Sequence, residues 1–194
     1  MRSIAISIVI AFAAALFAAG QESPSNFARA GDAALTYDWV HTNAQPGDCG
    51  CFGLNGGGVS TSVDLRPHWS AVADINAQAG NTLTLSSYQG GVRYRVSQGW
   101  ISEPWMKGPH APEPFAQALF GAAHSSGQVA GAANGSTSLA FRIGGGIDLP
   151  INTHFALRVI QADYYLTMAK NGVNDHQNNL LLATGFVYRW ARQH

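Results

Sequence analysis

Cys49 and Cys51 carry the most reactive side chains of the sequence, and only Gly50 separates them. In an oxidising compartment, two cysteines are expected to form a disulfide. A bridge across one intervening residue closes a tight ring, and strained, exposed disulfides are readily reduced. We predict a candidate disulfide that staples a loop. A reduced pair, a different pairing, and a metal or redox site are the alternatives.

Three histidines, His41, His124 and His176, are expected at the same rim of the molecule as the cysteines, an arrangement that would suit a soft metal ion. The chain has seven histidines, however, and their spacing follows no regular ligand pattern. We therefore predict no metal site and no cofactor.

The segment His124-Ser125-Ser126 pairs a histidine with a nearby serine. A catalytic serine needs a histidine base that is itself oriented by an acidic group. No glutamate follows Glu113, and the next predicted strand offers only Asp148, roughly 30 Å away if the strand spans a bilayer. We predict no catalytic residues, and interpret His124 as a rim histidine beside a loop.

Two glycine triplets, Gly56-Gly57-Gly58 and Gly144-Gly145-Gly146, lack the helix and the Lys-Ser/Thr pair that follow a phosphate-binding loop. Glycines inside predicted strands instead favour curvature or close packing.

The composition excludes a polyelectrolyte. The 194 residues include 11 Lys+Arg and 11 Asp+Glu, so the formal net charge is zero and 11% of residues are charged. Nucleic-acid binding needs a basic excess, and the lysines Lys107 and Lys170 cannot form a polybasic membrane anchor.

Residues 1–20 are interpreted as a signal peptide, because Arg2 precedes an apolar stretch from Ile4 to Ala19 that ends in small residues. A membrane anchor is the alternative, but the stretch is shorter than the roughly 20 residues that span a bilayer. No cysteine follows the stretch directly, so a lipoprotein is excluded. Residues 21–194 are expected to form one domain.

This domain alternates with period two, which predicts strands. An even number of strands suits closure into a barrel. Short connections at 66–68 and 150–154 alternate with longer polar ones, except that the connection at 80–81 is short and that at 97–113 is long. The eight predicted strands are 33–40, 53–65, 69–79, 82–96, 114–124, 137–149, 155–167 and 178–190.

Each predicted strand has one large apolar face and one small or polar face. A membrane barrel turns its apolar face outward to lipid, whereas a soluble sandwich would carry many charges outside. The apolar face of 178–190 holds Leu180, Leu182, Thr184, Phe186, Tyr188 and Trp190, and that of 137–149 holds Leu139, Phe141, Ile143, Ile147 and Leu149.

The polar faces together predict a charge network inside the barrel. Near balance between arginines and aspartates permits mutual pairing of buried charges; in a soluble protein the same residues would lie on the surface. The predicted network comprises Asp38, Asp64, Asp74, Arg93, Arg95, Arg142, Asp148, Arg158 and Arg189, accompanied by Ser60, Ser62, Asn76 and Gln78.

Aromatic residues near the predicted strand ends are typical of the two interfacial girdles of a membrane barrel. They are Tyr37 and Trp39 at one end, and Trp69, Tyr94, Phe155, Tyr188 and Trp190 at the other. In strand 155–167, continued alternation would turn Asp163 toward lipid. We expect a bulge near Ile160–Gln161 that turns Asp163 inward, or an Asp163 that lies above the hydrocarbon.

These features resemble the small OmpA-like or OmpX-like outer-membrane barrels. The similar segments are Tyr37-Asp38-Trp39, 114–121, 144–148 and 178–180. The resemblance implies an all-β fold, an eight-stranded antiparallel up-and-down transmembrane β-barrel, and says little about activity. Chains of this family usually end on an aromatic residue; Trp190 fits that position, but residues 191–194 follow it.

The sequence thus predicts a structural outer-membrane protein with a side-chain-plugged lumen and no enzyme activity, which presents loops for surface interactions. Its expected partners are outer-membrane lipids and the barrel assembly machinery, with no nucleic acid and a monomeric state. The alternatives are a narrow pore, a lipid-modifying barrel enzyme and a soluble lipocalin-like carrier.

Overall fold

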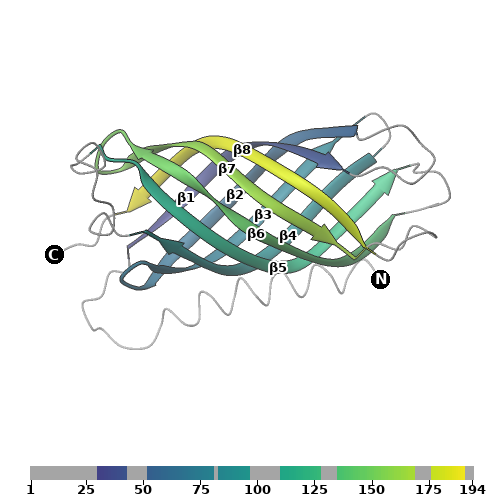
Figure 1. Ribbon diagram of the computed structural model, residues 1–194, viewed down its shortest axis with the longest axis horizontal. Helices are drawn as coiled ribbons and strands as arrows, with labels where there is room; N and C mark the ends of the chain where they lie inside the picture. Colours follow the sequence, from purple (N-terminus) through teal and green to yellow (C-terminus); the bar gives the residue numbers. More distant parts are fainter. Residues whose placement is uncertain are drawn as a thin grey trace.

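A computed structural model describes residues 30–42, 52–80, 83–96, 110–127, 135–168 and 176–190. Residues 1–20, Cys49, Cys51 and residues 191–194 lie outside this described part. The described residues form eight strands (Figure 1). They are β1 (Gly31–Thr42), β2 (Phe52–Arg66), β3 (Trp69–Ala79), β4 (Leu83–Arg95), β5 (Glu113–Gly127), β6 (Ser136–Pro150), β7 (Phe155–Thr167) and β8 (Gln177–Trp190).

The strands form a closed up-and-down barrel. Each strand pairs antiparallel with the next, and β8 returns to pair with β1 from Gly31↔Trp190 to Thr42↔Asn179. Closure matters because an open edge would leave unpaired backbone N–H and C=O groups. The predicted fold is therefore confirmed. The largest boundary differences are in β1, which extends two residues further at each end than the alternation indicated, and in β5, which continues three residues further to Gly127.

We refer to the two rims by their connections. The turn end holds the tight turn at 67–68, the turn at 151–154 and the 96–112 connection, and the loop end holds the connections at 43–51, 80–82, 128–135 and 168–176. Within the described residues, no helix is long and apolar enough to cross a membrane.

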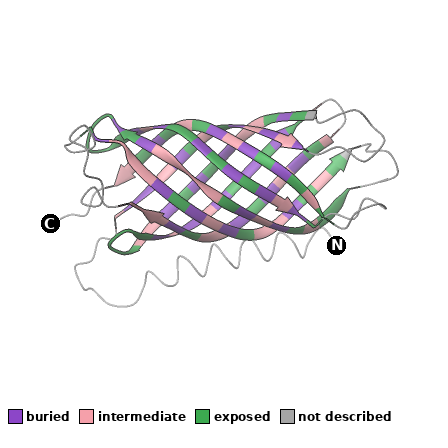
Figure 2. Ribbon diagram, viewed as in Figure 1, coloured by how far each residue is buried: buried purple, intermediate pink, exposed green. Residues whose placement is uncertain are grey.

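The polarity of the wall is inverted relative to a soluble protein. In Figure 2, buried positions recur along the strands between exposed or partly exposed ones. The exposed side chains include Leu35 and Phe186, both 64% exposed, and Phe120, 58% exposed, whereas Arg93, Arg142 and Arg158 are each 1% exposed. Large apolar side chains thus form an outer belt, and these arginines lie on the inner side of the wall.

β7 contains the irregularity that the sequence predicted. Val159 and Ile160 are both exposed, and between Arg158 and Gln161 the register with β8 skips one residue. The extra residue restores the inward direction of Gln161 and Asp163, and Asp163 is fully buried. The predicted bulge is confirmed, displaced by one residue toward Val159.

Aromatic residues lie near both rims. At the turn end, the rings of Trp69 and Tyr94 lie 5.1 Å apart on paired strands, and those of Phe155 and Tyr188 lie 5.4 Å apart. At the loop end, the Tyr37 hydroxyl donates to Asn55 at 2.7 Å and the Tyr164 hydroxyl donates to Asn178 at 2.6 Å. Amphipathic rings with polar partners at the rims suit a boundary between an apolar and an aqueous region.

Candidate functional site in the barrel lumen

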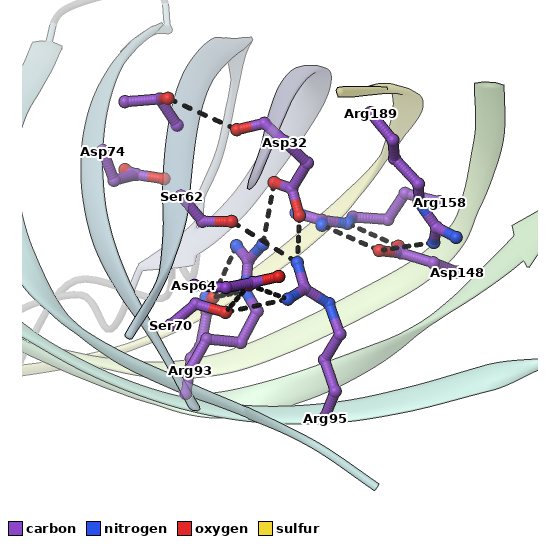
Figure 3. Close-up of polar contacts among 12 residues, drawn as sticks. Asp32, Ser62, Asp64, Ser70, Asp74, Arg93, Arg95, Asp148, Arg158 and Arg189 are labelled. Atoms are coloured by element: carbon purple, nitrogen blue, oxygen red, sulfur yellow. Dashed lines mark hydrogen bonds and ion pairs between the residues drawn. The ribbon is translucent and has the colours of Figure 1, made fainter. Parts of the chain in front are cut away.

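The turn end of the lumen is organised around Asp32, which sequence analysis did not single out. Its carboxylate lies between two guanidinium groups, that of Arg93 at 3.4 Å and that of Arg95 (Figure 3). Arg95 also pairs with Asp64 at 3.0 Å and donates to Ser70 at 2.8 Å. These contacts join β1, β2, β3 and β4 across the lumen.

A second group of ion pairs joins β5, β6, β7 and β8 at the same level. Arg158 donates to both carboxylate oxygens of Asp148, from Nε at 2.8 Å and from Nη2 at 3.1 Å. Arg189 pairs with Glu113 at 2.9 Å and approaches Asp148 at 4.0 Å. The contact between Arg158 and Asp148 is bidentate, which is the strongest form of an arginine–carboxylate contact.

Phe115 connects the two groups. The guanidinium carbon of Arg93 lies 4.8 Å from the centroid of the buried Phe115 ring, and that of Arg158 lies 4.6 Å from the same centroid. A cation over an aromatic face is stabilised by the ring quadrupole. Gln117, two residues further along β5, accepts from Arg93 Nη2 at 3.1 Å. We call the charged residues Asp32, Arg93, Asp148 and Arg158, together with Phe115, the ion-pair layer.

Arg142 is the centre of the network toward the loop end. It lies 2.8 Å from Asp74 on β3, a strand that is not adjacent to β6, and 3.2 Å from Asp163 on the adjacent strand β7. Asp163 also accepts from Gln117 at 3.0 Å and from Gln161 at 2.6 Å. In the strand as it stands, the β7 bulge places both Gln161 and Asp163 inside, because it absorbs the extra residue between Arg158 and Gln161.

Asp38 differs from the other interior carboxylates. Among the described residues it forms no ion pair; it accepts from Gln78 Nε2 at 3.1 Å, and Gln78 donates to Asn76 at 3.1 Å. Asn76 in turn donates to Asp74 at 2.8 Å. A chain of amides thus links the two carboxylates.

The formal charges are distributed unevenly along the axis. Near the turn end, four arginines (Arg93, Arg95, Arg158 and Arg189) face four acids (Asp32, Asp64, Asp148 and Glu113). Further toward the loop end, Arg142 faces Asp74 and Asp163, with Asp38 close by through Gln78. The second level therefore has two more acids than arginines, and we call its three aspartates the acidic level.

Above the acidic level the lumen becomes apolar. Large side chains from five strands meet there, with exposed fractions of 0% for Val40, Leu54 and Tyr165 and 1% for Leu181. Small residues fill the remaining positions. This apolar layer consists of Val40, Leu54, Leu85, Tyr165 and Leu181, packed with Ala123, Ala140 and Ala183. The sequence pattern did not predict it, because inward residues were expected to be polar.

All nine residues of the predicted network lie on the inner side of the wall, and eight of them take part in ion pairs there. The sequence missed Asp32 because the predicted first strand began at Ala33, although Asp32 has the same parity as Asp38. It missed Glu113 for the same reason, because that residue precedes the predicted fifth strand. Phe115 was missed because a large aromatic ring was not expected inside.

The other candidate residues are not brought together. His124 is exposed on the outer face, where its Nδ1 lies 2.9 Å from the Thr137 hydroxyl, whereas Asp148 is inside with Arg158. Among the described residues, no three His, Cys, Asp or Glu side chains form a group that could hold a metal ion. The cysteine pair lies outside the described residues.

Comparisons with known proteins agree with this architecture. The sequence matches no protein-family model and no curated protein. Among solved structures, Neisserial surface protein A is 15% identical, with a TM-score of 0.57, and the match covers 87% of this chain and 100% of that chain. The N-terminal β-barrel domain of Pseudomonas aeruginosa OprF is 13% identical, with a TM-score of 0.48, over 82% of this chain and 97% of that chain.

The attachment invasion locus protein Ail of Yersinia pestis is 13% identical, with a TM-score of 0.44, over 84% of this chain and 97% of that chain. The likeness to Neisserial surface protein A and the closed ladder of eight strands establish the architecture. The chain therefore has the fold of the small eight-stranded outer-membrane barrels.

Proposed function

We propose that this protein is a structural barrel of the bacterial outer membrane with a lumen closed by its own side chains. It is exported through the signal peptide at residues 1–20, inserted as a monomer by the barrel assembly machinery, and surrounded by outer-membrane lipids. Its loop-end segments at 43–51, 128–134 and 169–175 serve as the surface for interactions with other molecules.

The inverted polarity carries this proposal. An exposed belt that includes Leu35, Phe120 and Phe186 would be unfavourable in water, because exposed apolar surface is costly there. In lipid the same belt is solvated, and the closed ladder leaves no strand edge unpaired. A soluble carrier would instead turn apolar side chains inward along the whole lumen.

The lumen favours a structural role over a pore. Eight strands enclose an interior just wide enough for side chains. Closure is supported by the burial of inward side chains, because Arg93, Arg142 and Arg158 are each 1% exposed and Leu54 and Leu181 are 0% and 1% exposed.

Gel mobility with and without boiling tests membrane insertion. Detergent-extracted protein is expected to run as a compact band that shifts on heating, as a folded barrel does. Release of the protein into the aqueous periplasmic fraction, without detergent, would falsify the assignment.

Planar lipid bilayers test closure of the lumen. The wild-type protein is expected to give no conductance steps above background. Regular steps would favour the narrow pore instead.

We assign no catalytic step to the chain, because the exposed His124 contacts the Thr137 hydroxyl on the outer face, whereas Asp148, the acid of the next strand, is buried inside. A His124→Ala variant is expected to leave lipopolysaccharide acylation unchanged. A change in acylation would point to the lipid-modifying enzyme.

A further inference from the structure

The lumen contains two barriers of opposite chemistry. The ion-pair layer blocks it near the turn end with two buried guanidinium groups that both contact the ring of Phe115. The apolar layer blocks it near the loop end with Val40, Leu54, Leu85, Tyr165 and Leu181. An ion that meets an apolar constriction loses its hydration without gaining a partner, so such a layer stops ions by dewetting.

The side chains of both layers are buried. Arg93 and Arg158 are 1% exposed, and Leu54 and Leu181 are 0% and 1% exposed. Within the part of the chain that the structure describes, no hydrogen bond or ion pair joins the two layers, and the acidic level of Asp38, Asp74 and Asp163 separates them.

We propose that the two layers are barriers in series, so that the lumen conducts ions only when both are removed, and that the opened lumen is selective for small cations. This proposal rests on the closed barrel proposed above. The selectivity follows from the acidic level, where three aspartates face a single arginine and attract cations as acidic rings do in channels.

Three variants test the series arrangement. The apolar variant carries Leu54→Ser, Leu85→Ser and Leu181→Ser. The ion-pair variant carries Asp32→Ser, Arg93→Ser, Asp148→Ser and Arg158→Ser, which removes two charges of each sign. The combined variant carries all seven substitutions, and each protein is first checked for the compact, heat-shifted band of a folded barrel.

We expect no conductance steps from the wild type, the apolar variant or the ion-pair variant, and regular steps from the combined variant. Across a potassium chloride gradient, the combined variant should then show a reversal potential of the sign expected for a cation-selective pore. Adding Asp38→Asn should move that potential toward zero.

The matched control places three leucine-to-serine substitutions on the outer face. Leu35, Leu139 and Leu180 are 64%, 52% and 42% exposed. Leu35→Ser, Leu139→Ser and Leu180→Ser, combined with the ion-pair variant, are expected to leave the lumen closed because the apolar layer is intact.

Several results would overturn the series arrangement while the wild type stays closed. They are steps from either single-layer variant, steps from the outer-face control, no steps from the folded combined variant, or anion selectivity. Steps from the wild type itself would refute the closed barrel as well. If the combined variant does not fold, the milder set of Leu→Ala, Asp→Asn and Arg→Gln at the same positions gives the same test.

Discussion

Two ion pairs of the lumen differ in burial and should therefore differ in how much they contribute to the unfolding free energy. Asp148 is 3% exposed and holds Arg158 with two hydrogen bonds, whereas Asp64 is 39% exposed where it pairs with Arg95. Removal of one partner of a buried pair leaves an uncompensated charge, which typically costs about 3–5 kcal/mol. An exposed pair is worth about 0–1 kcal/mol.

Asp148→Ala should therefore lower the unfolding free energy by about 3–5 kcal/mol, and Asp64→Ala by at most about 1 kcal/mol. Urea titration of the barrel in phospholipid vesicles measures both. Equal losses would show that burial does not set the strength of these pairs.

At the residue scale, the sequence placed charges on a face but could not pair them. The alternation puts Arg93, Arg142 and Arg158 on the inner side. Their partners are distant in the chain: Asp32 lies 61 residues before Arg93, and Glu113 lies 76 residues before Arg189. Such pairs depend on how strands align around the closed barrel, which no local pattern contains.

Among the elements, β7 is the strand in which the sequence conflicts with regular alternation. Arg158 and Gln161 both point inward, and the adjacent Val159 and Ile160 both point outward. Without one of these two residues, the strand would alternate regularly from Arg158 to Asp163. The conflict itself predicted the bulge, because a charge at mid-bilayer costs about 2–4 kcal/mol.

Deletion of Ile160 is therefore expected to be tolerated, because it removes the bulge and keeps Gln161 and Asp163 inside. Deletion of Leu182 from the regular strand β8 is the matched control, and it should abolish folding by reversing the direction of every side chain on one side of the deletion. Folding of both deletion variants is measured by gel mobility with and without boiling, where a folded barrel gives a compact band that shifts on heating. Loss of that band in the Ile160 deletion alone would mean that the bulge is itself needed.

Gly144 lets β6 and β7 approach closely beside Arg142. A Cβ at this position would contact the Ala162 carbonyl oxygen and the Asp163 carboxylate, and would lie 2.5 Å from the Asp163 Cα. A Cβ at the outward-facing Gly57 would meet a single atom, the Thr36 carbonyl oxygen, at 2.9 Å. The two glycine triplets thus serve packing, as their position within strands indicated.

Gly144→Ala is expected to lower the unfolding free energy by about 1–3 kcal/mol, the usual cost of overpacking. Gly57→Ala should cost less, because only one contact must relax. The same urea titration compares them, and a larger loss for Gly57→Ala would contradict this account.

At the scale of the whole molecule, the environment of the outer face decides between a membrane barrel and a soluble one. Val59 lies at the middle of β2 and Leu65 near its turn end, and both are 55% exposed. If the outer face were in water, an arginine at either position would change the unfolding free energy by a similar amount. In a bilayer, the cost depends on depth: about 2–4 kcal/mol at the midplane and about 0–1 kcal/mol near the interface.

Val59→Arg is therefore expected to destabilise the vesicle-inserted barrel by about 2–4 kcal/mol and Leu65→Arg by at most about 1 kcal/mol. Unfolding in vesicles measures the difference. Equal effects of the two substitutions would argue against a membrane-spanning belt.

The sequence by itself determined the eight strands, their connections, and on which side of the wall each side chain lies. These properties follow from a period-two pattern that each strand carries locally. The tertiary structure decided which charges pair, that Phe115 contacts two guanidinium groups, and where the apolar layer lies. Those features arise only when eight strands close at one register, because closure brings together residues that are far apart along the chain.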